Sequence, residues 1–63
     1  MNYIFNIGHT QVIFHEELEG DYSVTCFMFA PKHNNWVPFS NSRVPVNEAF
    51  EMMARLTRRE LML

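Results

Sequence analysis

Two stretches near the N-terminus alternate between apolar and polar residues, as half-buried β-strands do. They are residues 2–7 and residues 10–18, separated by Gly8 and His9. Glycine at the first central position suits a two-residue type II′ turn, so we expect a β-hairpin. The facing pairs that this turn predicts are Ile7 with Thr10, Phe5 with Val12, Ile4 with Ile13 and Tyr3 with Phe14.

A third strand is predicted over residues 22–30, Tyr-Ser-Val-Thr-Cys-Phe-Met-Phe-Ala, which is rich in aromatic and β-branched residues. Gly20 precedes it and Pro31 follows it, and both residue types interrupt strands. A turn at Glu19-Gly20 would place Phe14 opposite Thr25 and Val12 opposite Phe27.

This register makes both faces of the three-stranded meander substantially apolar. One face would carry Tyr3, Phe5, Ile7, Val12, Phe14, Phe27 and Phe29. The other would carry Ile4, Ile13, Tyr22, Val24, Cys26 and Met28, together with the polar residues Asn6, Gln11 and His15.

Residues 31–45 are predicted to form a long irregular connection, because they contain three prolines and two clusters of asparagine and serine. The alternative is that residues 36–39, within this connection, form a short fourth strand, which Pro38 would confine to an edge of the sheet. A connection of this length in a small domain tends to be functional.

The period becomes helical from Val46 to about Leu61. Asn47 is the expected N-cap, and acidic residues follow in the first turn, where the helix dipole favours them. The apolar side of this helix is predicted to consist of Val46, Ala49, Phe50, Met53, Leu56 and Leu61.

The 63 residues predict one α+β domain over residues 1–63: an antiparallel meander of three strands, or four, with one C-terminal helix on one face (βββα). We expect the helix to cover the face that carries Phe5, Phe14 and Phe27. Because one helix covers only one face, the remaining apolar face predicts a homodimer or another protein partner.

Composition and net charge exclude or disfavour several classes of protein. The chain is 48% hydrophobic, which excludes a disordered protein, and its net charge of −2 disfavours broad nucleic-acid binding. The N-terminus lacks the pattern of a signal peptide, and no apolar run is long enough to cross a membrane. A lone cysteine, Cys26, fits the reducing cytoplasm.

The residues with reactive side chains do not form a motif that would predict an enzyme. The three histidines lack metal-ligand spacing, so neither a metal nor another cofactor is expected. Cys26 could share a face with His15, but no third residue orients the pair. The carboxylates Glu16, Glu17, Glu19 and Asp21 are expected to form a solvated acidic hairpin tip.

Trp36 and Phe39 are the best candidates for specific contacts, since tryptophan is enriched at interface hot spots. The alternative is that both cover the sheet edge. Arg43, in the same connection, belongs to the predicted partner-binding set. The set is completed by three helix arginines that would form an electrostatic rim: Arg55, Arg58 and Arg59.

The order of hairpin, Gly-Asp-Tyr-Ser-Val strand start and Asn-Glu-Ala-Phe helix start resembles the layout of the N-terminal half of HicB-type antitoxins. Those proteins have a proline-glycine-cysteine turn where this chain has Ala-Pro-Lys-His-Asn-Asn. The resemblance covers the layout and not the motif, so it assigns no family.

The sequence therefore predicts a small non-enzymatic cytoplasmic regulator or inhibitor that binds another protein. Small acidic chains of this plan recur among accessory proteins of bacteriophages and mobile elements. The alternative is a dimeric nucleic-acid-associated regulator that uses the helix arginines.

Overall fold

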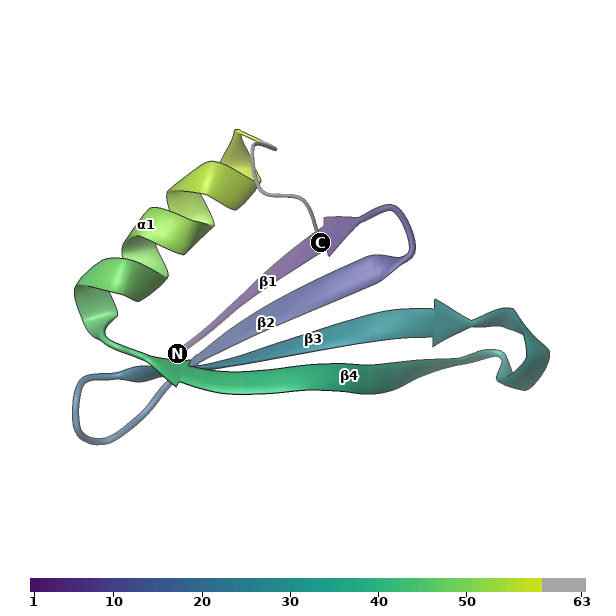
Figure 1. Ribbon diagram of the computed structural model, residues 1–63, viewed down its shortest axis with the longest axis horizontal. Helices are drawn as coiled ribbons and strands as arrows, with labels where there is room; N and C mark the ends of the chain where they lie inside the picture. Colours follow the sequence, from purple (N-terminus) through teal and green to yellow (C-terminus); the bar gives the residue numbers. More distant parts are fainter. Residues whose placement is uncertain (59–63) are drawn as a thin grey trace.

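A computed structural model describes residues 1–58 and shows a four-stranded antiparallel sheet followed by one helix (Figure 1). The strands lie in the sheet in chain order. The elements are β1 (Asn2–Ile7), β2 (Thr10–Glu16), β3 (Tyr22–Ala30), a 3-10 turn η1 (Pro31–His33), β4 (Asn35–Val44) and α1 (Val46–Thr57). The predicted α+β class is confirmed, with the fourth strand present.

The β1–β2 hairpin has the predicted register. Phe5 lies opposite Val12, and the other three predicted pairs are also present. Gly8 has a φ of +59°, while His9 has an ordinary negative φ. A positive φ at the first central residue alone is the requirement of a type II′ turn, which explains why glycine stands there.

The predicted register between β2 and β3 is wrong by one residue. Phe14 faces Val24, and Val12 faces Cys26. The reason is a three-residue loop where a two-residue turn was expected: the Glu17 amide donates to the Asp21 carbonyl at 2.8 Å, enclosing residues 18–20. Gly20 closes this loop with a φ of +87°, the left-handed conformation that such loops need in their last residue.

Because side chains alternate along a strand, this single residue moves all of β3 to the opposite faces. Tyr22 and Val24 join the core instead of the second face. Phe27 and Phe29 leave the core face, so the expectation that the helix covers Phe27 is also wrong. The second face consequently carries more polar residues than predicted.

β4 is a ten-residue strand along the whole of β3, where an irregular connection was expected. Its polar residues are paired along β3: Ser42 faces Val24, Ser40 faces Cys26, and Asn41 donates to the Thr25 hydroxyl at 3.0 Å. A register shift makes Phe39 the extra residue of a β-bulge, between Pro38 opposite Phe27 and Ser40 opposite Cys26.

The helix starts at Val46 with Pro45 at the N-cap position. Asn47 therefore lies inside the first turn, and the prediction that it caps the helix is wrong. Proline lacks an N–H and presets φ, which suits a helix start without a side-chain cap. The helix ends at Thr57, whose hydroxyl donates to the Met53 carbonyl. The predicted positions Arg59 and Leu61 lie outside the described residues.

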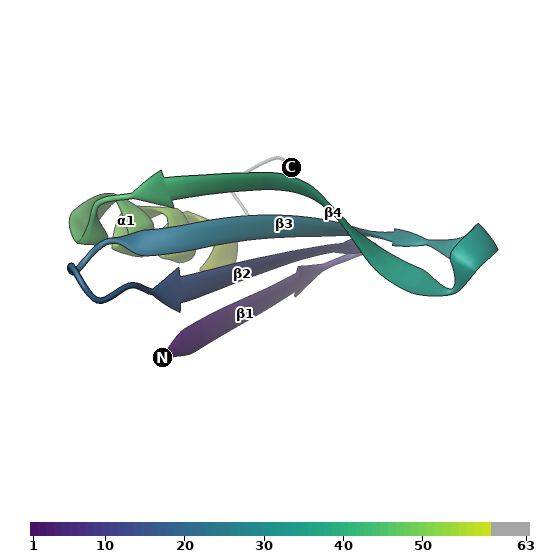
Figure 2. The ribbon, with the colours of Figure 1, turned by 90° about the horizontal axis from the view of Figure 1, so that it is seen from below.

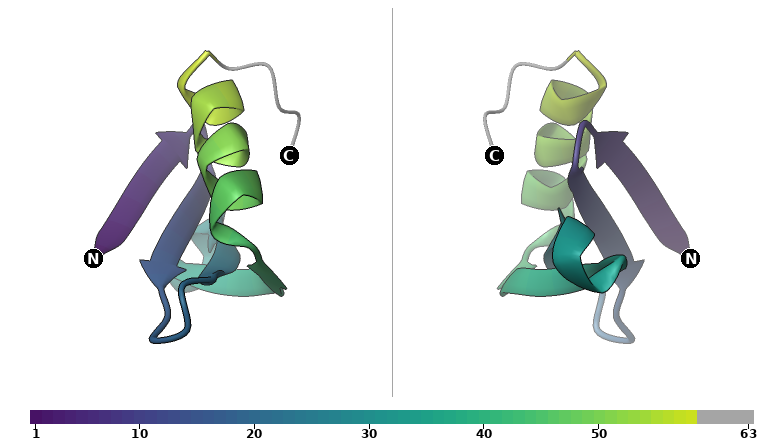
Figure 3. Two further views of the ribbon diagram at one scale, coloured as in Figure 1. Left: turned by 90° about the vertical axis from the view of Figure 1, so that its left-hand side faces the viewer. Right: turned by 90° about the vertical axis from the view of Figure 1, so that its right-hand side faces the viewer.

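The core lies between α1 and one end of the sheet, seen end-on in Figure 3. Its buried members are Val12, Phe14, Tyr22, Val24, Ala49, Met53 and Leu56. Of the predicted apolar side of the helix, Val46 and Phe50 are exposed at its flank, and Phe50 contacts the Tyr22 ring at 5.7 Å between centroids. The helix leaves the other end of the sheet uncovered (Figure 2).

Candidate functional site

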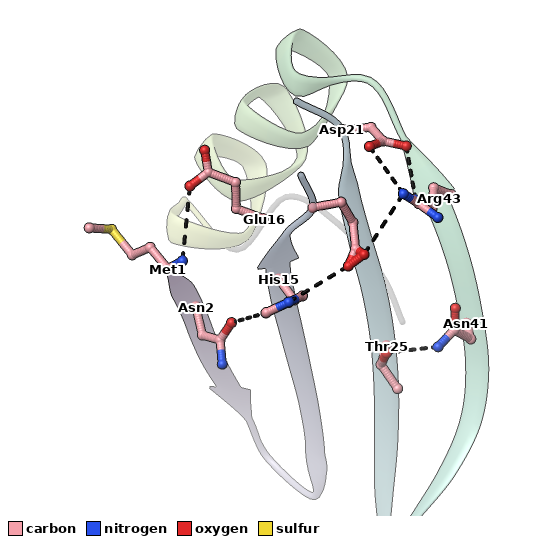
Figure 4. Close-up of polar contacts among 9 residues, drawn as sticks. Met1, Asn2, His15, Glu16, Asp21, Thr25, Asn41 and Arg43 are labelled. Carbon is pink, nitrogen blue, oxygen red and sulfur yellow. Dashed lines mark hydrogen bonds and ion pairs between the residues drawn. The ribbon is translucent and has the colours of Figure 1, made fainter. Parts of the chain in front are cut away.

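A polar network crosses the face of the sheet opposite the helix (Figure 4). The Asn2 side-chain oxygen contacts Nδ1 of His15, and His15 Nε2 lies 3.6 Å from Glu17 Oε1. Glu17 in turn lies 3.8 Å from an Arg43 nitrogen, and Arg43 Nε pairs with Asp21 at 2.9 Å. The network therefore joins β1, β2 and β4 through the acidic hairpin.

Arg43 has a structural role in this network. Its guanidinium holds the two carboxylates that flank the three-residue loop, Glu17 and Asp21. Arginine suits this role because its planar group presents several donors at fixed angles. The predicted solvated acidic tip is thus partly neutralised by an arginine that was expected to contact a partner.

At the opposite end of the sheet, β3 and β4 project beyond the β1–β2 turn as a two-stranded ribbon (Figure 1). The last rung shared with β2 is Met28 opposite Thr10, after which the Phe29 amide donates to the His9 carbonyl at 2.9 Å. We call residues 27–39 the distal ribbon; it comprises the projecting part and the last two rungs that β3 shares with β2. It has one formally charged residue, Lys32, at its tip.

One face of the distal ribbon is aromatic. Phe29 faces Trp36, and their rings meet edge to face with centroids 5.4 Å apart. The His9 ring stacks on Phe29 from the β1–β2 turn at 6.4 Å. Phe27 precedes them on the same face, opposite Pro38. The aromatic rings support one another in a fixed arrangement and remain only partly buried.

The other face of the distal ribbon is aliphatic. Met28 pairs with Val37, and these side chains are 52% and 43% exposed. They are on the helix side of the sheet, past the end that α1 covers. Phe39, in the bulge, is 50% exposed. The distal ribbon therefore exposes apolar side chains on both of its faces.

The structure brings together only part of the predicted binding set. Trp36 and Phe39 lie three residues apart in the first half of β4, whereas Arg43 lies near the other end of the same strand. Arg55 is paired with Glu51 at 3.1 Å on the helix, and Arg58 is the helix C-cap. The arginines among residues 1–58 do not surround the two aromatic residues.

Reactive side chains are dispersed in the same way. His15 lies opposite Ser23, on the face away from Cys26, so the two residues do not share a face. Burial raises the pKa of the Cys26 thiol, and a hydrogen bond to Ser40 lowers it by a smaller amount. A raised pKa reduces the thiolate fraction, the reactive form in nucleophilic catalysis.

Within residues 1–58, no group of three or more histidine, cysteine, aspartate or glutamate side chains is arranged to hold a metal ion. A hollow of about 280 Å³ is lined by Glu48, Glu51, Met52 and Arg55. Two of its lining residues, Glu51 and Arg55, form an ion pair. Helices in the described part of the chain are too short or too polar to cross a membrane.

Sequence reasoning identified Trp36 and Phe39 but missed the residues that flank them, Phe27, Phe29, Met28 and Val37. The signal was present in the alternation of residues 22–30, which separates aromatic from aliphatic positions. The wrong register assigned Phe27 and Phe29 to the core face and Met28 to the second face, and Val37 was expected in the long connection or in its short alternative strand.

No family model, no curated protein and no solved structure with which we compared this chain matches it.

Proposed function

We propose that this protein is a small non-enzymatic regulator or inhibitor that binds another protein through the distal ribbon. One observation carries the proposal: the distal ribbon, at the end of the sheet that the helix leaves uncovered, exposes apolar side chains and has a single formal charge. Exposed apolar surface of this kind commonly marks a protein interface.

The ribbon shape indicates how the partner would be engaged. A projecting element with two apolar faces is buried best by a cleft, which contacts both faces at once. Trp36 would be the central anchor, since buried aromatic residues contribute most to interface energy and its ring is already positioned by Phe29. Occupying a cleft in this way is a mode of inhibition or regulation that needs no catalytic group.

The size and composition of the chain fit a cytoplasmic accessory protein of the type that bacteriophages and mobile elements carry. The competing proposal, a nucleic-acid-associated regulator, is less well supported. Arg43 and Arg55 are each paired with carboxylates, which reduces the positive field available to phosphates.

Affinity capture from a lysate of the native host, followed by mass spectrometry, tests the proposal with a matched pair of variants. Phe39 and Phe50 are 50% and 49% exposed, but only Phe39 is in the distal ribbon. We expect Phe39→Ala and Trp36→Ala to lose the captured protein, and Phe50→Ala to retain it. For a hot-spot residue the loss corresponds to about 2 kcal/mol or more, roughly a 30-fold weaker affinity.

Circular dichroism would verify that all three variants remain folded. Retention of the partner by both ribbon variants, or its loss only in Phe50→Ala, would contradict the proposal. Capture of nucleic acid that is released by moderate salt and by arginine substitution would favour the competing function.

A further inference from the structure

The two edges of the sheet differ in their protection against further strand pairing. β4 carries Pro38 and a β-bulge, both of which hinder the addition of another strand. β1 has neither, and its six residues, Asn-Tyr-Ile-Phe-Asn-Ile, have no charge. Within residues 1–58 no strand pairs with its outer side. An uncharged and regular edge of this kind is a template for another strand.

The hydrogen bonds to β2 identify which backbone groups of β1 point outward. The Met1 carbonyl accepts from the Glu16 amide at 3.2 Å, so Met1 is directed toward β2. Backbone direction alternates along an antiparallel strand, and every second residue after Met1 is therefore also directed toward β2. The N–H and C=O groups of Asn2, Ile4 and Asn6 are left pointing away from the sheet.

We infer that a second copy of this chain pairs with β1 in antiparallel orientation, with the two-fold axis at Ile4. In this register Ile4 faces Ile4 of the second copy, and Asn2 faces Asn6 in both directions. Each pair exchanges both of its backbone hydrogen bonds, so all the outward groups are used. Shifting the axis by one residue, to Tyr3 or Phe5, leaves Asn6 or Asn2 of each copy without a partner.

The side chains favour a second copy over an unrelated partner because the segment is chemically symmetric about Ile4. It reads asparagine, aromatic, isoleucine, aromatic, asparagine over residues 2–6. On one face, the exposed Ile4 side chains (55%) would contact each other. On the helix face, Tyr3 would stand opposite Phe5, and both are half-buried in the single chain. The interface is isologous, as two-fold symmetry requires.

Disulfide trapping tests the register directly. In a Cys26→Ser background, Ile4→Cys should form an intermolecular disulfide under mild oxidation, because facing residues have Cα atoms about 5.5 Å apart. Asn6→Cys is the matched control. Its two copies would be offset by four residues, about 13 Å along the strand, and should not cross-link.

Charge reversal tests the same contact without a covalent bond. Ile4→Lys places like charges opposite each other, and we expect it to raise the dimer Kd about tenfold or more in sedimentation equilibrium. Leu18→Lys adds the same charge in the exposed hairpin loop and should leave the Kd unchanged. Mixing Ile4→Lys with Ile4→Glu should restore association as a heterodimer.

A monomer at all concentrations of the wild-type chain, equal cross-linking of the two cysteine variants, or an unchanged Kd for Ile4→Lys would each overturn this inference. Circular dichroism of the lysine variants separates loss of pairing from loss of fold. Dimers that persist in Ile4→Lys but dissociate in Phe39→Ala would place the contact between copies on the distal ribbon instead.

Discussion

Cys26 illustrates how the neighbours of one residue set its chemistry. It lies in the middle of β3 between Val12 on one side and Ser40 on the other. Removing its thiol from water disfavours the thiolate, while the Ser40 hydrogen bond favours it. The net effect is a raised pKa, so the side chain acts as a small apolar packing group at neutral pH.

The alkylation rate of Cys26 should therefore show a displaced pH profile. We expect the midpoint of the iodoacetamide reaction to lie above that of the urea-unfolded chain, and Ser40→Ala to move it higher still. Because the folded thiol holds its proton more tightly, stability should fall as pH rises through the ordinary thiol pKa toward the raised one. Cys26→Ala should remove this part of the slope. An alkylation midpoint at or below that of the unfolded chain would contradict the assignment.

Among elements, the loop between β2 and β3 has the largest structural consequence. Its three residues decide which side chains of β3 face the helix. The loop depends on Gly20, whose φ of +87° is unfavourable for any residue with a Cβ atom. An added Cβ would meet no other atom within 4 Å, so the cost of a substitution comes from the backbone alone.

Gly20→Ala should consequently destabilise the protein by about 1–2 kcal/mol, the cost of a left-handed conformation in an ordinary residue. Glu19→Ala is the control, because Glu19 belongs to the same loop without a positive φ. Chemical denaturation of both variants measures the difference. Equal midpoints for the two would show that the loop conformation does not limit stability.

The strands differ in how well their pairing could be predicted from the sequence. The β1–β2 register was predictable because Gly8-His9 matches one turn type and the alternation on both sides agrees with it. The β2–β3 register was not, because Leu18, Glu19 and Gly20 fit loops of two or three residues equally well. The full length of β4 was not predicted because Ser40, Asn41 and Ser42 are residue types common in loops. Their pairing with β3 makes them part of a strand.

For the candidate site, Trp36 and Phe39 were identifiable by residue type alone. Their neighbours in the distal ribbon required the correct register. Arg43 was misplaced for a different reason: pattern reasoning put it beside Trp36 and Phe39 in one connection but could not show that it pairs with Asp21 across the hairpin.

At the scale of the whole molecule, the core is confined to one end and is small. The principal axes measure 37, 25 and 16 Å, and the buried residues lie under a single helix. Phe14 is fully buried at its centre, in edge contact with Phe5 at 5.7 Å. A chain of this size has a net stability of only roughly 3–5 kcal/mol.

Phe14→Ala removes about 3–5 kcal/mol, which is the whole of that stability, so we expect the variant to be unfolded at 25 °C. Phe14→Leu should remain folded with a lower melting temperature. The neighbouring Ile13, on the opposite face, serves as the control, and Ile13→Ala should have a smaller effect. Thermal melts followed by circular dichroism would check all three. A cooperative native-like transition in Phe14→Ala would contradict this account of the core.

The odd number of residues in the β2–β3 loop also constrains how the gene can change. Surface loops usually accept the gain or loss of a codon with little effect. A one-residue slip at this loop, with Leu18 in place of Glu17 opposite Asp21, would turn β3 over, presenting Tyr22 and Val24 to water and placing Ser23 and Thr25 beneath the helix. A descendant of this gene that gains or loses a codon here should therefore keep the fold only where the new loop still closes the pair between Glu17 and Asp21.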